Sequence, residues 1–419
     1  MIATTTQVNR LNPEHSRLLP LKGSVQPYAW GKPGSESRIF SMLSEPATGP
    51  LAEYWIGVHP RGMAQVISSD GTERALGEQI AERPEYFLGQ TGARHFSGRL
   101  PFLLKILSIN PDFGLSIQAH PNKVLAAYLR EKDPERYPDA NHKPEIAIPL
   151  TRLTLLKGFR PLSEISEFFQ RYPALAEIVG EEARQELLNT GGATGASTSV
   201  TLKALYSAIL RADEASVARC VAAIRSRIET SGNPGAEETH FLRLNAKHGD
   251  TDRGLLSIFV LNLVRVEPGK AIFTGPNIAH AYLDGDLVEC MADSDNVVRA
   301  GLTNKFMDVE TLIEMLEYVP EQPSVITPQR DSDGFDVFQS QAEEFEVSML
   351  PRDSTSSSLT SNSLPMVLMM LGESCVVSCQ NTRERIVLRD GGALFIPPDS
   401  GIFDLSRTNS SLIRVRPNI

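Results

Sequence analysis

The hydrophobic positions in the N-terminal third of the chain come in short runs that Gly, Pro and Asn residues separate, a pattern typical of β-strands. Residues 100–109 form an almost uninterrupted apolar run that ends at an Asn-Pro-Asp turn, which predicts a buried strand. Residues 113–119 predict a second strand, so the two would form a hairpin. Asn122 is then placed to cap a short helix that ends at Arg130.

From residue 157 to residue 254 the apolar residues recur every three or four positions, which is the spacing of one face of an α-helix. A segment rich in Gly, Ser and Thr at 190–197 interrupts this helical region. The β-type pattern returns at residue 255, with a predicted strand at 258–266 and short strands after about residue 325. The chain is therefore predicted to be mainly β with a helical insert.

A ten-residue pattern recurs in the two β-rich segments of the chain. Residues 268–277 align without gaps with residues 390–399, at a constant offset of 122. In both copies a strand, a glycine turn, a second strand and a proline turn follow in the same order, as expected of double-sheet jelly rolls, including cupins. The same offset pairs His280 with Ile402, so only the first copy offers a metal ligand at this position.

Together these patterns predict two cupin-type jelly rolls and an all-α domain. Residues 1–156 and 255–325 would form the first jelly roll, which carries the candidate chemistry described below. Residues 157–254 would form the helical domain. Residues 326–419 would form a second jelly roll without metal ligands.

Composition and charge limit the classes of partner. The chain has 419 residues and a formal net charge of −10, which argues against nucleic acid and against an anionic membrane surface as partners. The N-terminus lacks the apolar core of a signal peptide, and no apolar run approaches the roughly 18 residues that span a bilayer. We therefore expect a cytoplasmic monomer whose four cysteines are reduced and buried.

Four residues have the chemistry of metal ligands. Gln118 and His120 lie two positions apart, and alternate side chains of a strand share a face, so both could bind one ion. Glu145 and His280 could complete a mixed N/O ligand set of the kind that suits zinc. On spacing alone, however, an isolated Gln-x-His pair is more often polar surface, and an isolated histidine more often lies in a turn.

A dense polar stretch at 288–305 holds candidate groups for anion binding and proton transfer. Arg299 and Lys305 have the charge that binds phosphate, and Glu289 or Asp295 could move protons. Lys143 is a further cation, which shares a face with Glu145 if that segment is extended. The alternative is a solvated loop with surface ion pairs.

Several segments together resemble the type I phosphomannose isomerases, which are zinc enzymes of the cupin superfamily. The matching segments follow the order of the family and are residues 28–31, 52–60, 100–107, 115–121, 141–145 and 285–305. The helical insert and the C-terminal strands agree with the family in their general residue pattern more than in specific motifs.

The resemblance implies a role for each candidate residue. The zinc ligands of the family fall on Gln118, His120, Glu145 and His280, which implies one Zn²⁺ per chain. The active-site arginine falls on Arg299, the site lysines on Lys143 and Lys305, and the site acids on Glu289 and Asp295. Ser116 matches a position that lines the substrate pocket.

The implied reaction interconverts two small sugar phosphates, mannose 6-phosphate and fructose 6-phosphate, through an enediol that zinc stabilises as a Lewis acid. The candidates for the base that transfers the proton are Glu289, Asp295, His142 and a zinc-bound water. The candidates for the acid or base that assists ring opening are His142 and Lys143. Arg299 would bind phosphate or stabilise the charge of the intermediate. The alternatives are another sugar-phosphate isomerase or epimerase, and a non-catalytic cupin that binds sugar.

Overall fold

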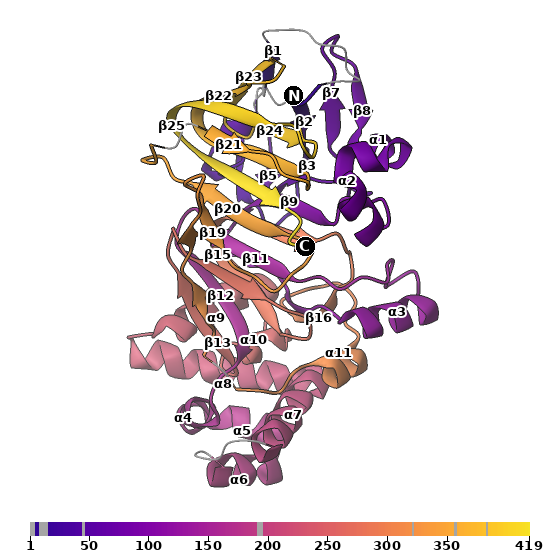
Figure 1. The fold of residues 1–419 in the computed structure, drawn as a ribbon. Helices are drawn as coiled ribbons and strands as arrows, with labels where there is room; N and C mark the ends of the chain where they lie inside the picture. Colours follow the sequence, from indigo (N-terminus) through magenta and orange to yellow (C-terminus); the bar gives the residue numbers. More distant parts are fainter. Residues whose placement is uncertain are drawn as a thin grey trace.

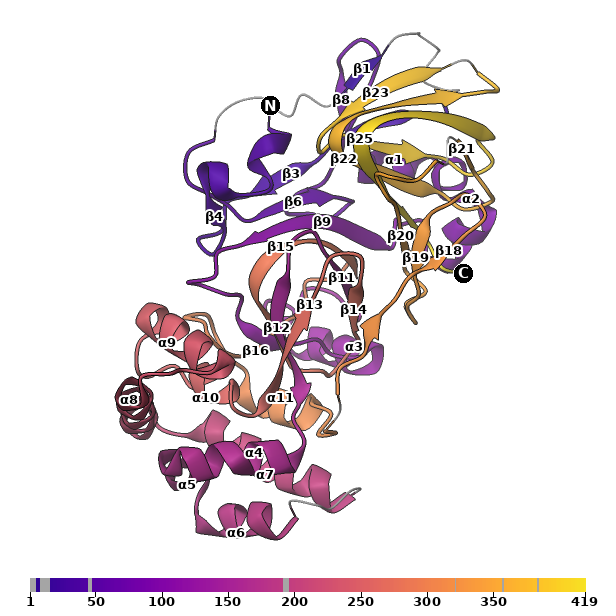
Figure 2. The ribbon, with the colours of Figure 1, turned by 90° about the vertical axis from the view of Figure 1, so that its left-hand side faces the viewer.

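The computed structural model describes residues 5–7, 16–43, 47–190, 196–320, 322–355, 358–382 and 384–419. Two large β-sheets lie side by side, and most of the helices gather at the end of the molecule that is far from the C-terminal strands (Figure 1). A view turned by 90° shows the same separation of strands and helices (Figure 2). None of the described helices is long and apolar enough to cross a membrane.

The first sheet has 11 strands within the described residues and is organised around β15 (His280–Ala292). Its other strands are β3 (Ser24–Gln26), β6 (Glu53–Ile56), β9 (Phe102–Ile109), β10 (Ile117–Ala119), β11 (Glu145–Pro149), β12 (Leu153–Phe159), β13 (Leu261–Val266), β14 (Ala271–Thr274), β16 (Val298–Gly301) and β17 (Val325–Ile326). A separate two-stranded sheet joins β4 (Lys32–Pro33) to β5 (Pro50–Leu51).

The two halves of β15 have different neighbours. The first half pairs with β10 and β12, and the second half pairs with β9 and β11. Gly285 lies between the halves with a φ of 133°, and a side chain at this position would lie 2.9 Å from the carbonyl oxygen of Arg152. A glycine therefore allows the strand to change partners, so that one strand contributes to both parts of the sheet.

The second sheet has 12 strands within the described residues and contains the C-terminal strands. Its strands are β1 (Thr5–Gln7), β2 (Leu19–Lys22), β7 (Gln65–Ile67), β8 (Glu73–Ala75), β18 (Gln329–Arg330), β19 (Asp336–Phe338), β20 (Glu346–Leu350), β21 (Ser358–Thr360), β22 (Met366–Cys379), β23 (Arg385–Arg389), β24 (Ala393–Ile396) and β25 (Ile402–Arg416). β22 and β25 are long, with 14 and 15 residues, so the prediction of only short strands after residue 325 is wrong.

The N-terminal strands depart from the expected division of the chain, which assigned all of residues 1–156 to the first unit. β2 pairs with β24, with Leu19 opposite Phe395, and β2 pairs on its other side with β7. The sheet that contains residues 326–419 therefore includes strands from the N-terminus. The local sequence pattern could not predict this pairing, because an apolar strand carries no signal for which distant strand it joins.

The predicted helical insert corresponds to a run of helices between β12 and β13 within the described residues. Its helices are α4 (Leu162–Arg171), α5 (Pro173–Val179), α6 (Glu181–Thr190), α7 (Ala196–Arg211), α8 (Glu214–Ser231), α9 (Ala236–His248) and α10 (Gly254–Ser257). Residues 191–195 of the Gly/Ser/Thr-rich segment lie outside the described residues. The remaining helices are α1 (Leu76–Glu82), α2 (Pro84–His95), α3 (Lys123–Lys132), α11 (Val309–Met315) and two short 3₁₀ turns, η2 (Gly34–Glu36) and η3 (Phe40–Met42).

Three local predictions can be compared with the structure. The Asn122 side chain accepts a hydrogen bond of 2.9 Å from the Leu125 backbone, so the predicted helix cap is confirmed. The predicted hairpin is wrong, because β10 pairs with β15 and β16, whereas β9 pairs with β6 and β15. The strand predicted at 258–266 begins only at Leu261, because α10 and the turn after it occupy the preceding residues.

The repeat at offset 122 is confirmed in the backbone. The first and last residues of β14 and β24 are related by this offset. The first residues of β15 and β25 are related by the same offset. Gly269 and Gly391 have φ values of 83° and 78°, and Asn277 and Asp399 have φ values of 63° and 52°. The same turns with the same left-handed residues therefore connect the corresponding strands.

Replacing Phe395 by Ala tests whether the N-terminal and C-terminal segments share one core. Phe395 is fully buried, and its ring centroid lies 5.5 Å from that of Phe87 on α2. We expect Phe395→Ala to lower the free energy of unfolding by about 3–5 kcal/mol, measured by urea denaturation.

The matched control is Ile402→Thr, because Ile402 is 43% exposed. We expect its effect to stay within about 0.5 kcal/mol. Equal effects of the two substitutions would contradict a shared core at this position.

Candidate active site

A cavity of about 610 Å³ opens over one face of the 11-stranded sheet. Its lining includes every second residue of three neighbouring strands, such as Leu103 and Lys105 on β9 and Glu289 and Met291 on β15, because alternate side chains share a face. The lining aromatic residues are Tyr28, Trp30, Trp55 and Phe113. The cavity therefore combines apolar and aromatic walls with charged groups, as ligand sites usually do.

Three buried side chains meet beside this cavity and can hold a metal ion. They are His120, directly after β10, Glu145 at the start of β11 and His280 at the start of β15, and their ligand atoms lie within 4.8 Å of one another. Oε2 of Glu145 lies 3.1 Å from Nε2 of His280, and Oε1 lies 3.4 Å from Nε2 of His120. Pairing of Gln118 with His280 across β10 and β15 brings these segments together.

The backbone sets the orientation of both histidines. The Nδ1 atom of His120 lies 2.8 Å from the carbonyl oxygen of Asn296, and that of His280 lies 3.0 Å from the carbonyl oxygen of Ile278. Because a carbonyl only accepts hydrogen bonds, each Nδ1 donates, and a neutral ring then presents the lone pair of Nε2. Nε2 of His120 is buried and has no hydrogen-bond partner.

The protonation of the cluster also fits a metal ion. Burial, and then the charge of Lys143, lower the pKa of His120 to about 4, so the ring is neutral. Burial raises the pKa of Glu145, but Lys143 and His120 act against it, and the net pKa is well below its usual value. The lone pair of His120 and the ring of His280 therefore face a carboxylate, and a shared divalent cation would satisfy all three groups.

Gln118 borders the same cluster. It lies two residues before His120 on β10, opposite His280 on one side and Arg299 on the other, and it lines the cavity. Its amide oxygen is a suitable ligand for a borderline divalent ion. The donor set present at the site thus contains the types of ligand that zinc accepts.

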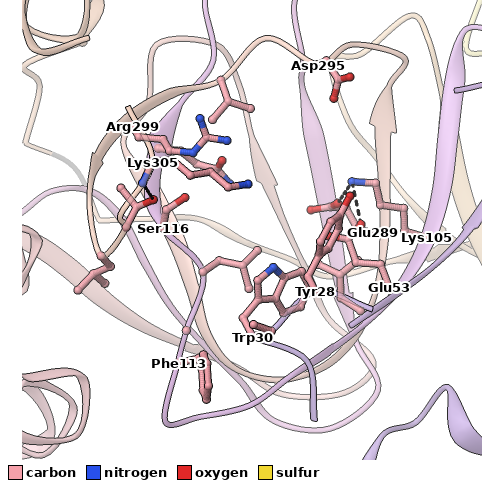
Figure 3. Close-up of a pocket in the computed structure, with 18 of the residues that line it drawn as sticks. Tyr28, Trp30, Glu53, Lys105, Phe113, Ser116, Glu289, Asp295, Arg299 and Lys305 are labelled. Carbon is pink, nitrogen blue, oxygen red and sulfur yellow. Dashed lines mark hydrogen bonds and ion pairs between the residues drawn. The ribbon is translucent and has the colours of Figure 1, made fainter. Parts of the chain in front are cut away.

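Ser116, Arg299 and Lys305 lie together on one side of the cavity (Figure 3). Burial and then the charge of Arg61 lower the pKa of Arg299, and burial and then the charge of Arg299 lower that of Lys305. Neither cation forms an ion pair within the part of the chain that the structure describes. Two closely spaced cations without an acidic partner form a binding site for an anion such as a phosphate.

Lys105, Glu53 and Glu289 form a charged group on the opposite side of the cavity (Figure 3). Nζ of Lys105 lies 3.1 Å from Oε2 of Glu289 and 3.6 Å from Oε2 of Glu53, which also accepts a hydrogen bond from Trp55. Burial raises the pKa of Glu289. Burial lowers the pKa of Lys105, but Glu53 and Glu289 raise it, and the net value lies above the usual one.

Sequence reasoning did not assign Lys105 and Glu53 to the site. Lys105 is the only charged residue in the apolar run at 100–109. A lone charge in a buried strand requires a partner, and this signal could have identified Lys105 as a site residue. Glu53 carried no comparable local signal.

Asp295 lies at the rim of the cavity and is held by His59 and Arg61. Its Oδ2 lies 3.2 Å from Nε2 of His59, and its Oδ1 accepts a hydrogen bond from Arg61. Burial raises the pKa of Asp295, but the bond to His59 and the charges of His59 and Arg61 lower it, and the net pKa is below its usual value. Asp295 is therefore ionised at neutral pH.

The adjacent residues His142 and Lys143 have different surroundings. Nζ of Lys143 lies 2.7 Å from Oε1 of Glu145, and Lys143 lines the cavity. His142 is not among the lining residues, and its Nε2 lies 2.7 Å from Oε1 of Glu344. Successive side chains of an extended segment point in opposite directions, so this placement argues against direct action of His142 on a substrate.

Comparisons with known proteins agree with this site. Residues 18–162 match the sequence model of the family described as phosphomannose isomerase type I, catalytic domain. Mannose-6-phosphate isomerase from Mus musculus is 37% identical over 404 residues, which cover 92% of this chain and 95% of the mouse protein. The Homo sapiens enzyme has the same identity and coverage.

Solved structures of phosphomannose isomerases are also similar to this chain. A variant of phosphomannose isomerase from Salmonella typhimurium superposes with a TM-score of 0.83 at 28% identity, covering 96% of this chain and 100% of that one. A mannose 6-phosphate isomerase bound with zinc and yttrium superposes with a TM-score of 0.81 at 28% identity and the same coverage. The resemblance found in the sequence is thereby confirmed, and the chain belongs to the type I phosphomannose isomerase family.

Proposed function

We propose that this chain is a zinc-dependent aldose–ketose isomerase that interconverts mannose 6-phosphate and fructose 6-phosphate. The observation that carries this proposal is the buried cluster of His120, Glu145 and His280 beside a cavity that has unpaired cations on one side and a carboxylate–ammonium pair on the other. A binding protein without catalysis has no evident need for this combination of a metal cluster and buried proton-transfer groups.

Four residues of this chain would hold the metal. His120 and His280 would bind through Nε2, Glu145 through its carboxylate and Gln118 through its amide oxygen. When bound, zinc supplies a Lewis acid that stabilises negative charge on the oxygen atoms of the opened sugar. Lys143, which pairs with Glu145, keeps that carboxylate ionised and oriented.

Ser116, Arg299 and Lys305 would bind the phosphate of the substrate. A guanidinium and an ammonium supply charge-assisted hydrogen bonds to phosphate oxygens, and the serine hydroxyl adds a donor. Because phosphate takes no part in the isomerisation, this binding fixes the position of the sugar carbons relative to the opposite side of the cavity.

Glu289 is the base that we favour for proton transfer. An isomerisation removes a proton from the second carbon of the sugar and returns it to the first, so one group must accept and then donate the same proton. The raised pKa of Glu289 suits both steps, and Lys105 stabilises its ionised form at 3.1 Å. Asp295, which is ionised and exposed to the cavity, is suited to accept the proton of the anomeric hydroxyl during ring opening.

We also infer a division of the chain into two cupin-type jelly rolls with an all-α domain at 157–254. The first roll would contain residues from 1–156 and 255–325, and the second would contain residues 326–419 together with the N-terminal strands that pair with them. The strand and turn pattern at offset 122 supports this inference, because each roll would hold one copy.

The proposed reaction is tested with a coupled assay that detects fructose 6-phosphate formed from mannose 6-phosphate. We expect turnover by the zinc-loaded chain, loss of activity after treatment with a chelator, and recovery after zinc is added back. A zinc-loaded protein that is inert on mannose 6-phosphate but acts on another sugar phosphate would favour the alternative isomerase or epimerase.

Glu289→Gln tests the assignment of the base. We expect kcat to fall by about 10²–10⁴-fold, with KM and zinc content close to those of the wild type. In the wild type kcat should rise with pH through the pKa of Glu289, because the base must be ionised, and the variant should lose this dependence.

The matched control is Glu267→Gln, which removes a carboxylate from an exposed ion pair with Arg152. We expect it to leave kcat unchanged. A Glu289→Gln variant that keeps wild-type kcat and its pH profile would exclude Glu289 as the base.

A further inference from the structure

Asp252 connects the helical insert to the phosphate-binding side of the cavity. It lies between α9 and α10, and its carboxylate accepts three backbone hydrogen bonds. Oδ1 accepts from the N–H groups of Gly254 and Leu302, both at 2.8 Å, and Oδ2 accepts from that of Thr303 at 3.0 Å. Two of the three donors thus lie about 50 residues away in the sequence, in the segment that follows β16.

The backbone of that segment adopts a conformation that an ordinary residue avoids. Leu302 has a φ of 54°, which is in the left-handed region, and its side chain is buried. Such a residue keeps this conformation only when its surroundings hold it, and the hydrogen bond from its N–H to Asp252 does so directly.

The two chain segments also touch through their glycines. A side chain on Gly301 would lie 2.4 Å from Cα of Gly254, and one on Gly254 would lie 2.5 Å from the backbone nitrogen of Leu302. The backbones are therefore in direct contact, so a displacement of the Asp252 turn displaces the segment after β16.

The two cations of the phosphate site lie on either side of Leu302 in the chain, Arg299 on β16 and Lys305 in the segment after it. Arg299 lies three residues before Leu302 and Lys305 three residues after it, and both line the cavity. The N–H group of Lys305 donates to Oγ1 of Thr303 at 3.1 Å, so the backbone of Lys305 is linked through Thr303 to Asp252. The like charges of Arg299 and Lys305 repel each other, and their approach requires a backbone that is held from outside.

We propose that Asp252 is a positioning residue for substrate phosphate: its carboxylate holds the Gly301–Leu302–Thr303 backbone so that Arg299 and Lys305 converge on one anion. The inference rests on the proposed function, because it takes the phosphate to bind on this side of the cavity. The proposal gives the helical insert a role in substrate binding, since Asp252 lies in the turn after α9, the last long helix of the insert.

Asp252→Asn tests this role. The substitution keeps the shape of the side chain but places an NH₂ group opposite one of the backbone donors and removes the negative charge. We expect KM for mannose 6-phosphate to rise about tenfold or more, with kcat changed by less than about threefold, because the lost interaction affects binding and not the proton transfer.

A second readout separates positioning from a general loss of structure. We expect the Kd of inorganic phosphate for the zinc-loaded protein, measured by isothermal titration calorimetry, to rise by a factor similar to that of KM, with unchanged zinc content. If wild type does not turn over mannose 6-phosphate but Asp252→Asn still weakens phosphate binding, the proposed function fails and the inference about Asp252 stands.

Asp250→Asn is the matched control. Asp250 lies two residues away and pairs with Arg225 and Asn245, both within the helical insert. We expect it to leave KM and the Kd of phosphate unchanged. Asp252→Glu keeps the charge but lengthens the side chain, and we expect it to weaken phosphate binding as well. This variant is used in place of Asp252→Asn if Asp252→Asn does not fold.

Unchanged KM and phosphate affinity in a folded Asp252 variant would overturn the proposal. A fall in KM would also overturn it, because it would mean that the carboxylate repels the substrate phosphate directly.

Discussion

The burial of one carboxylate, that of Glu145, is the constraint on which the site depends. Glu145 is 1% exposed, and an ionised carboxylate in such a place is unfavourable unless charged or hydrogen-bonding partners surround it. Lys143 supplies one partner at 2.7 Å, and the Nε2 atoms of His120 and His280 lie at 3.4 and 3.1 Å. A divalent cation held by the carboxylate and the two imidazoles would complete this arrangement.

The chain arranges the chemistry around that centre through a single strand. β15 begins at His280, changes neighbours at Gly285 and then carries Glu289 to the pair that it forms with Lys105. A proposed metal ligand and the proposed base are thus fixed by one continuous backbone. The proposed phosphate-binding side is built separately, by β16 and the segment after it, and the backbone of that segment donates hydrogen bonds to Asp252 of the helical insert.

Local pattern predicted the parts of the structure that depend on neighbouring residues, such as the helical insert, the cap at Asn122 and the repeated turns at offset 122. The alternation of side chains placed Gln118 and His120 together, but only the resemblance joined them to Glu145 and His280. Features that need distant segments were missed, among them the pairing of β2 with β24 and the role of Lys105. Such pairings depend on register and charge partners that no local window contains.

X-ray absorption at the zinc K edge of the zinc-loaded protein tests the metal centre most directly. We expect one zinc per chain, bound by nitrogen and oxygen atoms at about 2.0–2.2 Å with the scattering pattern of two imidazoles. That pattern should disappear in a variant that carries both His120→Ala and His280→Ala. A sulfur shell at about 2.3 Å, or an unchanged spectrum in the double variant, would contradict the assignment of His120, Glu145 and His280 as the metal site.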